Sequence, residues 1–193
     1  MHIYDKDFVQ GELPMTKQEV RAVSIAKLQL NEDSILIDVG AGTGTIGIEA
    51  ATYMKKGKVI AIEKEEKGLK VIKGNVKKFN LENYSLVHGR APEDIPEISY
   101  DRMFIGGSTG GMKDIVDHFL KFSKDNSRLV INAITLETMS SAMEILKEKG
   151  FKNIEVVNMT VARGKKVGPY TMMYGENPIY IITVVKEEKN NGE

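Results

Sequence analysis

The segment best suited to chemistry is a glycine-rich turn between an apolar run and a helical pattern. Residues 34–44 are SILIDVGAGTG, so Gly40, Gly42 and Gly44 follow closely after Asp38. Glycine has no Cβ atom, so the tail of a small ligand can lie against the bare backbone of such a turn. The free N–H groups at the start of the following helix can then bind a carboxylate. The turn therefore predicts a small-ligand site.

Two nucleoside cofactors fit this turn, and the position at which the turn begins separates them. Residues 42–47, GTGTIG, match the pattern G-x-G-x-x-G, which would indicate an NAD-dependent oxidoreductase. In a dehydrogenase the tight turn begins at the first glycine of that pattern, directly after the strand. Here the predicted strand ends at Val39 and the turn begins at Gly40. The pattern that starts at the end of this strand, D-x-G-x-G-x-G, resembles motif I of the class I methyltransferases and favours S-adenosylmethionine.

A second acid supports a nucleoside site without choosing between the cofactors. Residues 58–63, KVIAIE, form another apolar run that closes on Glu63. Glu63 follows Gly44 by about 20 residues, the spacing of a ribose-binding carboxylate in a βαβ unit. The alternatives are a solvated acid at a strand end and an ordinary turn at residues 40–44.

Composition limits the other functions that the chain can have. The 193 residues, 41% of them hydrophobic, predict one domain with a sizeable core. The 27 basic and 27 acidic residues balance, so no net field attracts nucleic acid or an anionic membrane. There is no cysteine, and the three histidines are scattered, so we expect no metal site. No apolar stretch is long enough for a membrane span, and we expect a cytoplasmic protein.

Apolar periodicity predicts strands that alternate with helices along most of the chain. We expect a helix over 16–31, begun by a T-x-x-E capping box at Thr16 and Glu19, then a cofactor-binding core over 34–150. Residues 151–186 carry the last two strands and a long connection, and 187–193 form a disordered tail. The predicted strands cover 34–39, 59–63, 84–87, 101–105, 128–134, 151–161 and 179–185.

This order of elements predicts an α/β fold. Five βα alternations followed by two strands imply a Rossmann-like, doubly wound, seven-stranded sheet that is mostly parallel, with an antiparallel last strand. That is the layout of a class I methyltransferase. Ligands of such sheets bind beyond the carboxyl ends of the strands. The turn at 40–44, Glu63, residues 88–91 and the glycine cluster at 106–111 all fall at those ends.

The chain resembles one family over nearly its whole length: the decarboxylating precorrin and cobalt-precorrin C15-methyltransferases of cobalamin biosynthesis. The resemblance rests on an ordered set of short motifs at 14–16, 19–21, 38–44, 89–93, 106–108, 136–138, 162–164 and 177–178. It implies methylation at C15 of a corrin precursor, coupled to loss of CO2 from the acetate on C12. It also implies a homotetramer, with a separate precorrin C5-methyltransferase as an expected functional partner.

The resemblance also implies which residues contact the cofactor. They are Thr16, Gly40, Ala41, Gly42, Thr43, Gly44, Glu63 and Ala91. For Thr16, a plain helix cap is an equal alternative. The chain departs from the family at Arg90, where an aspartate is usual, so adenine selection would depend on the backbone at Ala91.

Fewer residues are predicted to contact the methyl acceptor than the cofactor. Gly106 and Gly107 permit close approach of a ligand, and their Ile-Gly-Gly-Ser context differs from the [DN]-P-P-[YF] of enzymes that methylate exocyclic amines. Arg163, in a possible cationic rim with Lys165 and Lys166, suits bidentate binding of a substrate carboxylate. Glu137 is the one acid we would name for acid–base work, with a helix N-terminal acid as its alternative.

Several alternatives stay open at this point. The chain could methylate another small molecule, a tRNA or a protein, or it could be a noncatalytic subunit that binds S-adenosylmethionine. In the connection 164–178, Pro169, Tyr170, Met172, Met173 and Tyr174 concentrate apolar surface, which predicts an interface. The alternative is a lid that folds over the cleft.

Overall fold

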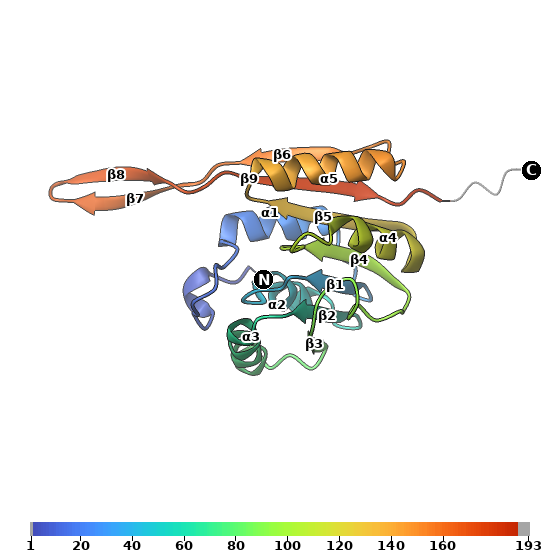
Figure 1. Ribbon diagram of the computed structural model, residues 1–193. Helices are drawn as coiled ribbons and strands as arrows, with labels where there is room; N and C mark the ends of the chain where they lie inside the picture. The colour runs from blue at the N-terminus through green and yellow to red at the C-terminus, as the bar shows by residue number, and fades with distance from the viewer. Residues whose placement is uncertain (1, 189–193) are drawn as a thin grey trace, which may run out of the picture.

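Seven strands form one sheet in the computed structural model, which describes residues 2–188 (Figure 1). Their order is β3-β2-β1-β4-β5-β9-β6. The first five strands in the chain pair in parallel, and β9 is antiparallel to both of its neighbours. The predicted fold class is confirmed. The strands are β1 (Ile35–Val39), β2 (Lys58–Glu63), β3 (Tyr84–His88), β4 (Tyr100–Ile105), β5 (Ser123–Ala133), β6 (Glu155–Met159) and β9 (Ile179–Val185).

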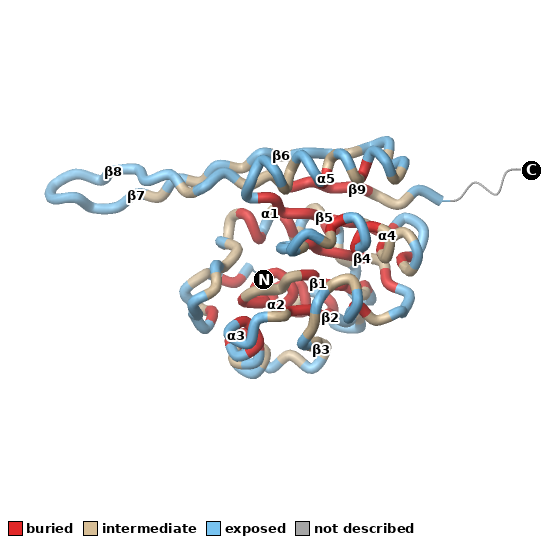
Figure 2. The backbone as a smooth tube through the Cα atoms, viewed as in Figure 1, coloured by how far each residue is buried: buried red, intermediate tan, exposed pale blue. Residues whose placement is uncertain are grey.

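Helices cover both faces of this sheet, and many residues of its central strands are buried, as the red segments of Figure 2 show. One face packs against α4 and α5, and the other packs against α1 and α2, with α3 beside α2. Each strand of the sheet centre is therefore buried on both sides, which explains why the strand sequences are continuously apolar. The helices are α1 (Gln18–Leu28), α2 (Thr45–Tyr53), α3 (Glu66–Lys78), α4 (Met112–Phe122) and α5 (Leu136–Glu148). No helix among residues 2–188 could span a membrane.

The start of α1 differs from the prediction. The helix begins at Gln18 with Lys17 as its N-cap, and no side chain of the described residues caps it. The capping box fails because Glu19 is held by Arg163, from the far end of the chain, with bonds of 3.0 and 2.5 Å. The carbonyl of Thr16 instead accepts a hydrogen bond of 2.7 Å from Arg21.

The connection before the last strand is more regular than predicted. It forms a separate two-stranded ribbon, β7 (Ala162–Val167) and β8 (Tyr170–Gly175), which projects away from the body of the molecule (Figure 1). It does not fold over the sheet as a lid. The preceding strand is shorter than 151–161, and β5 begins earlier than residue 128. Most of the tail predicted to be disordered, 189–193, lies outside the described residues.

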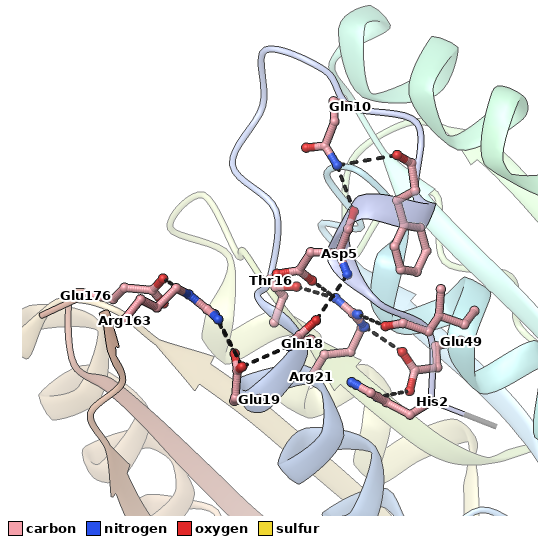
Figure 3. Close-up of polar contacts among 12 residues, drawn as sticks. His2, Asp5, Gln10, Thr16, Gln18, Glu19, Arg21, Glu49, Arg163 and Glu176 are labelled. Carbon is pink, nitrogen blue, oxygen red and sulfur yellow. Dashed lines mark hydrogen bonds and ion pairs between the residues drawn. The ribbon is translucent and has the colours of Figure 1, made fainter. Parts of the chain in front are cut away.

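A fully buried arginine, Arg21, attaches the N-terminal segment to the body (Figure 3). Its Nε donates to Glu49 on α2 at 2.6 Å, and its Nη1 donates to Asp5 at 3.0 Å. Two backbone carbonyls of the segment, those of Ile3 and Thr16, accept its remaining bonds at 2.5 and 2.7 Å. One guanidinium therefore fixes both ends of residues 3–16.

A second buried group is Asp38, at the end of β1. Its Oδ2 accepts a hydrogen bond of 3.1 Å from the N–H of Gly47, whereas its Oδ1 has no partner among residues 2–188. The hydroxyl of Tyr84 is also buried and has no partner in the same part of the chain. Burial, reinforced by the negative charge of Glu63, raises the pKa of Asp38 to about 7.

We predict that Arg21→Met destabilises the protein by about 3 to 5 kcal/mol, because it removes the guanidinium from the buried carboxylate of Glu49 and leaves that carboxylate with contacts from the side chains of His2 and Tyr53 alone among residues 2–188. Asp5→Asn removes a more exposed partner of the same arginine, so it should cost less than about 1 kcal/mol. Urea unfolding followed by circular dichroism measures both. Equal losses for the two variants would contradict this account of Arg21.

We predict that Asp38→Asn stabilises the protein at pH 8 but not at pH 4. A carboxyl whose folded pKa lies near 7, above its usual value of 3.8, favours folding below pH 4, and this contribution is lost as the pH rises through 7. The asparagine keeps an acceptor for Gly47 and carries no charge. The variant therefore avoids the loss of about 4 kcal/mol in the free energy of unfolding that ionisation of Asp38 causes in the wild-type protein. Urea unfolding of both proteins at several pH values measures the difference. If the difference in the free energy of unfolding between the two proteins is the same at pH 4 and pH 8, the pKa of Asp38 is not raised.

Candidate cofactor and substrate site

A cavity of about 480 Å³ lies at the carboxyl ends of the parallel strands. It collects the loops that follow β1, β2, β3, β4 and β5, together with residues of the N-terminal segment and the start of β9. The sequence-predicted residues that line it are Thr16, Gly40, Ala41, Gly42, Thr43, Glu63, Ala91, Gly106 and Gly107.

The turn after β1 needs glycine for two different reasons. Gly40 has a φ of +66°, and a Cβ atom there would lie 2.4 Å from the carbonyl oxygen of Gly107. This contact lets the loops after β1 and β4 approach each other. Gly42 has a φ of +59° but faces more open space, with the carbonyl of Pro14 at 3.8 Å from its ideal Cβ position. Gly42 therefore leaves room inside the cavity.

Glu63 braces this turn from β2. Its Oε2 accepts a hydrogen bond of 2.6 Å from the N–H of Gly42, and its Oε1 accepts one of 2.7 Å from Glu65. Its side chain is nearly buried but reaches the cavity wall. Each carboxylate oxygen keeps a further lone pair, so Glu63 can also accept from a ligand hydroxyl.

Gly44 lies outside the cavity lining. Its φ is +77°, and a Cβ atom there would meet Ile72 at 2.8 Å. In this structure Gly44 turns the chain into α2. The first residues of that helix, Thr45 and Ile46, do line the cavity, and the N–H groups of a first helical turn have no intrahelical acceptors. The beginning of α2 can thus receive an anionic group.

The N-terminal segment closes one side of the cavity. Leu13, Pro14 and Met15 line it beside Thr16. Pro14 and Met15 belong to a motif of the family resemblance, and nothing local in the sequence marks them as cavity residues. The position of this wall depends on Arg21, which holds the carbonyl of Thr16 (Figure 3).

Two cations of the described cavity wall lie on the same side. Lys64 follows β2 and Arg90 follows β3, next to Ala91. The backbone N–H of Arg90 donates to Asp94 at 2.7 Å, and its guanidinium makes no ion pair or hydrogen bond with residues 2–188. This side of the cavity is therefore the polar and charged one.

The opposite side of the described wall, toward β5 and β9, is mainly apolar around one amide, although Ser108, Thr109 and Asp114 line the cavity after β4. Ile46 and Phe104 belong to the core cluster beneath α1, and Ile134 and Ile179 complete the wall. Asn132, at the carboxyl end of β5, is the amide. Sequence analysis missed it, although an asparagine that interrupts the apolar run LVINAI at a strand end was an available signal.

Besides Gly44, two further predicted residues do not reach the cavity, Arg163 and Glu137. Arg163, on β7, donates from Nη1 and Nη2 to Glu19 and from Nε to Glu176 at 2.6 Å (Figure 3). The hydrogen bonds that Arg163 donates to Glu19 are the main cause that lowers the pKa of Glu19 to about 2. Glu137 is exposed in the first turn of α5, as its alternative implies. The roles of Arg163 in substrate binding and of Glu137 in acid–base chemistry stay predictions.

Comparisons by sequence point to one family. Residues 7–186 match the model of a precorrin methyltransferase domain. A protein of Saccharolobus solfataricus, named as a probable cobalt-precorrin-6B C(15)-methyltransferase (decarboxylating), is 38% identical over 94% of this chain and 92% of its own length. A protein of Pyrobaculum calidifontis with the same name is 40% identical over 94% of both chains.

Solved structures agree. A precorrin-6y C5,15-methyltransferase from Geobacter metallireducens superposes with a TM-score of 0.87 at 40% identity, over 95% of this chain and 97% of that one. A precorrin 8w decarboxylase from Methanobacterium thermoautotrophicum also has a TM-score of 0.87, at 30% identity, over 94% and 98% of the two chains. With the sequence matches, these likenesses confirm the resemblance: the chain belongs to the precorrin methyltransferase family.

Proposed function

We propose that the protein is an S-adenosylmethionine-dependent C-methyltransferase of the cytoplasm. It methylates C15 of a cobalt-precorrin of the precorrin-6B type and removes the carboxylate of the C12 acetate as CO2, in cobalamin biosynthesis. The observation that carries this proposal is the divided cavity, polar after β2 and β3 and apolar after β5, in a chain whose relatives bear that name.

The cavity fits S-adenosylmethionine. Glu63 can accept from ribose hydroxyls, Ala91 presents backbone to the adenine, and the start of α2 can take the carboxylate of the amino-acid tail. A Cβ atom at Gly107 would meet nothing within 4 Å, so the wall after β4 also leaves open space. When bound, the cofactor supplies the methyl group as an electrophilic sulfonium, and little acid or base is asked of the protein.

The residues of the chain then have to align the reacting atoms. With S-adenosylmethionine bound, C15 would form its bond to the methyl group as the methyl–sulfur bond breaks, and S-adenosylhomocysteine would be the leaving group. The loops after β1 and β4, packed together at Gly40 and Gly107, would hold the cofactor in position. The apolar side chains toward β5 and β9 would limit the access of water to the acceptor.

We further propose that four copies assemble and that a separate protein performs the C5 methylation. A two-stranded ribbon is marginally stable alone, and β7–β8 projects from the body (Figure 1). Tyr170 is 73% exposed and Met173 is 66% exposed. Such apolar surface suits the buried centre of an interface.

The cofactor site is tested with two glycines that share a positive φ. Gly42→Val should abolish S-adenosylhomocysteine binding, because its side chain would occupy the cavity. Gly150→Val introduces a comparable strain at a φ of +83°, outside the cavity, and should leave affinity intact. Glu63→Gln should weaken binding by about 1.5 to 3 kcal/mol. Calorimetry with S-adenosylhomocysteine and with NAD measures these effects. Unchanged affinity in both site variants, or preference for NAD, would overturn the assignment.

The assembly is tested by light scattering. The double variant Tyr170→Glu with Met173→Glu should break a wild-type tetramer, because it places charge in the proposed interface. Ser141→Glu, on the exposed face of α5, is the matched control and should leave the tetramer whole. A monomeric wild-type protein at micromolar concentration would contradict the tetramer. A tetramer that survives the double variant would place the interface elsewhere.

Turnover with S-adenosylmethionine and a trapped corrin intermediate tests the activity itself. The product should gain one methyl group and lose one CO2 by mass. Methylation of a tRNA or a protein in place of the corrin precursor would favour the alternative acceptors.

A further inference from the structure

The amide of Asn132 is held in one orientation by Ser24 of α1. Asn132 Nδ2 lies 3.0 Å and Oδ1 lies 3.1 Å from the Ser24 hydroxyl, which also lies 2.8 Å from the carbonyl of Val20. A hydroxyl has one proton, and the shortest contact, to Val20, receives it. The hydroxyl oxygen must then accept from Nδ2. Asn132 is left with one N–H and with Oδ1 as groups for a ligand.

Strand order places this amide on the far side of the proposed cofactor position. Ala91 follows β3, Glu63 ends β2, and Gly40 follows β1, so adenine, ribose and tail would lie in that order across the sheet. Asn132 on β5 is three strands from Glu63, or about 14 Å at the usual strand spacing. It therefore lies beyond the transferred methyl group, where the acceptor has to be.

The surroundings of Asn132 would favour loss of CO2. Ile46, Phe104, Ile134 and Ile179 are apolar residues of the cavity wall, and the charged residue that follows the adjacent strand β4 is an acid, Asp114. Both cations of the described cavity wall, Lys64 and Arg90, follow the distant strands β2 and β3. A cation would stabilise a carboxylate and hold back its breakdown, whereas a neutral amide can orient it with less stabilisation. A poorly solvated carboxylate loses CO2 more readily.

We propose that Asn132 binds the carboxylate of the acceptor that is lost as CO2, with its free Nδ2–H as the donor. This inference rests on the proposed function and adds the group that orients the leaving carboxylate. The bond between the acetate methylene and the carboxylate breaks, CO2 departs, and the electron pair passes into the conjugated macrocycle. The methylene then takes one proton from water and becomes a methyl group.

Asn132→Asp and Asn132→Leu test the proposal, with S-adenosylmethionine and the trapped corrin intermediate as substrates. Asn132→Asp keeps the shape but places a like charge against the carboxylate, and Asn132→Leu keeps the volume without a donor. Each should lower kcat/KM for CO2 release by about 10- to 100-fold, the loss expected for a hydrogen bond to a charged group. Calorimetric affinity for S-adenosylhomocysteine should not change. Asn126→Asp, at the other end of β5, is the control and should retain full turnover.

Ser24→Ala supplies a second measurement if either Asn132 variant folds poorly. It keeps Asn132 but removes the hydroxyl that orients it, so methylated product that still holds its carboxylate should accumulate. CO2 release at the wild-type rate in the folded variants would overturn the role of Asn132 alone. Loss of S-adenosylhomocysteine affinity would instead assign the amide to the cofactor tail. A wild-type protein that binds the cofactor but converts no corrin intermediate would overturn the proposed function and this inference with it.

Discussion

Three backbone N–H groups of the turn after β1 donate sideways to the end of β2, and the cavity depends on this attachment. The carbonyl of Ile62 accepts from Gly40 at 3.0 Å and from Ala41 at 3.1 Å, and Glu63 accepts from Gly42. The turn is thus held flat against the edge of the sheet, with its other side free for a ligand. Gly68 extends the same arrangement, because a Cβ atom there would lie 2.6 Å from the carbonyl of Gly42. The first turn of α3 can therefore pack directly beneath.

The order of strands then divides the cavity by chemistry. Loops from β2 and β3 bring acids and cations to one side, whereas β5 and β9 enter from the apolar core and bring isoleucines. The polar side suits a nucleoside, which needs directional hydrogen bonds. The apolar side suits a large conjugated ring, which needs contact area and freedom from water. A single crevice can therefore hold two very different molecules without a second domain.

Sequence alone predicted the parts of the site that depend on local rules. The turn at Gly40 and Gly42 and the acid at Glu63 follow from strand phase and spacing, and the structure brings them together. Features set by distant partners were missed. The capping box at Glu19 is locally plausible, but Arg163 lies 144 residues away and takes that carboxylate. No periodicity along the chain reports such a competition.

The amide at Asn132 belongs to the same class of missed features. Its exposure to the cavity depends on how β5 meets α1, and its orientation depends on Ser24, which lies 108 residues away in the chain. The ribbon β7–β8 was predicted as an apolar connection because its residues are unusual for a loop, yet its regular pairing was not foreseen. Alternation of side chains is hard to recognise where both faces carry large apolar groups, as Met172 and Met173 do.

The place of β9 between β5 and β6 has a consequence for how the protein is made. Within residues 2–188, β6 pairs with β9 alone, and β9 is the last of the described strands to be synthesised. While the ribosome is still adding the residues before β9, β6 has no neighbour, and the edge of β5 is open. The nascent protein therefore presents one unpaired strand, β6, and one open sheet edge, at β5, until β9 has been made, and such edges are where chains associate wrongly. Closure of the sheet has to wait for this one late strand.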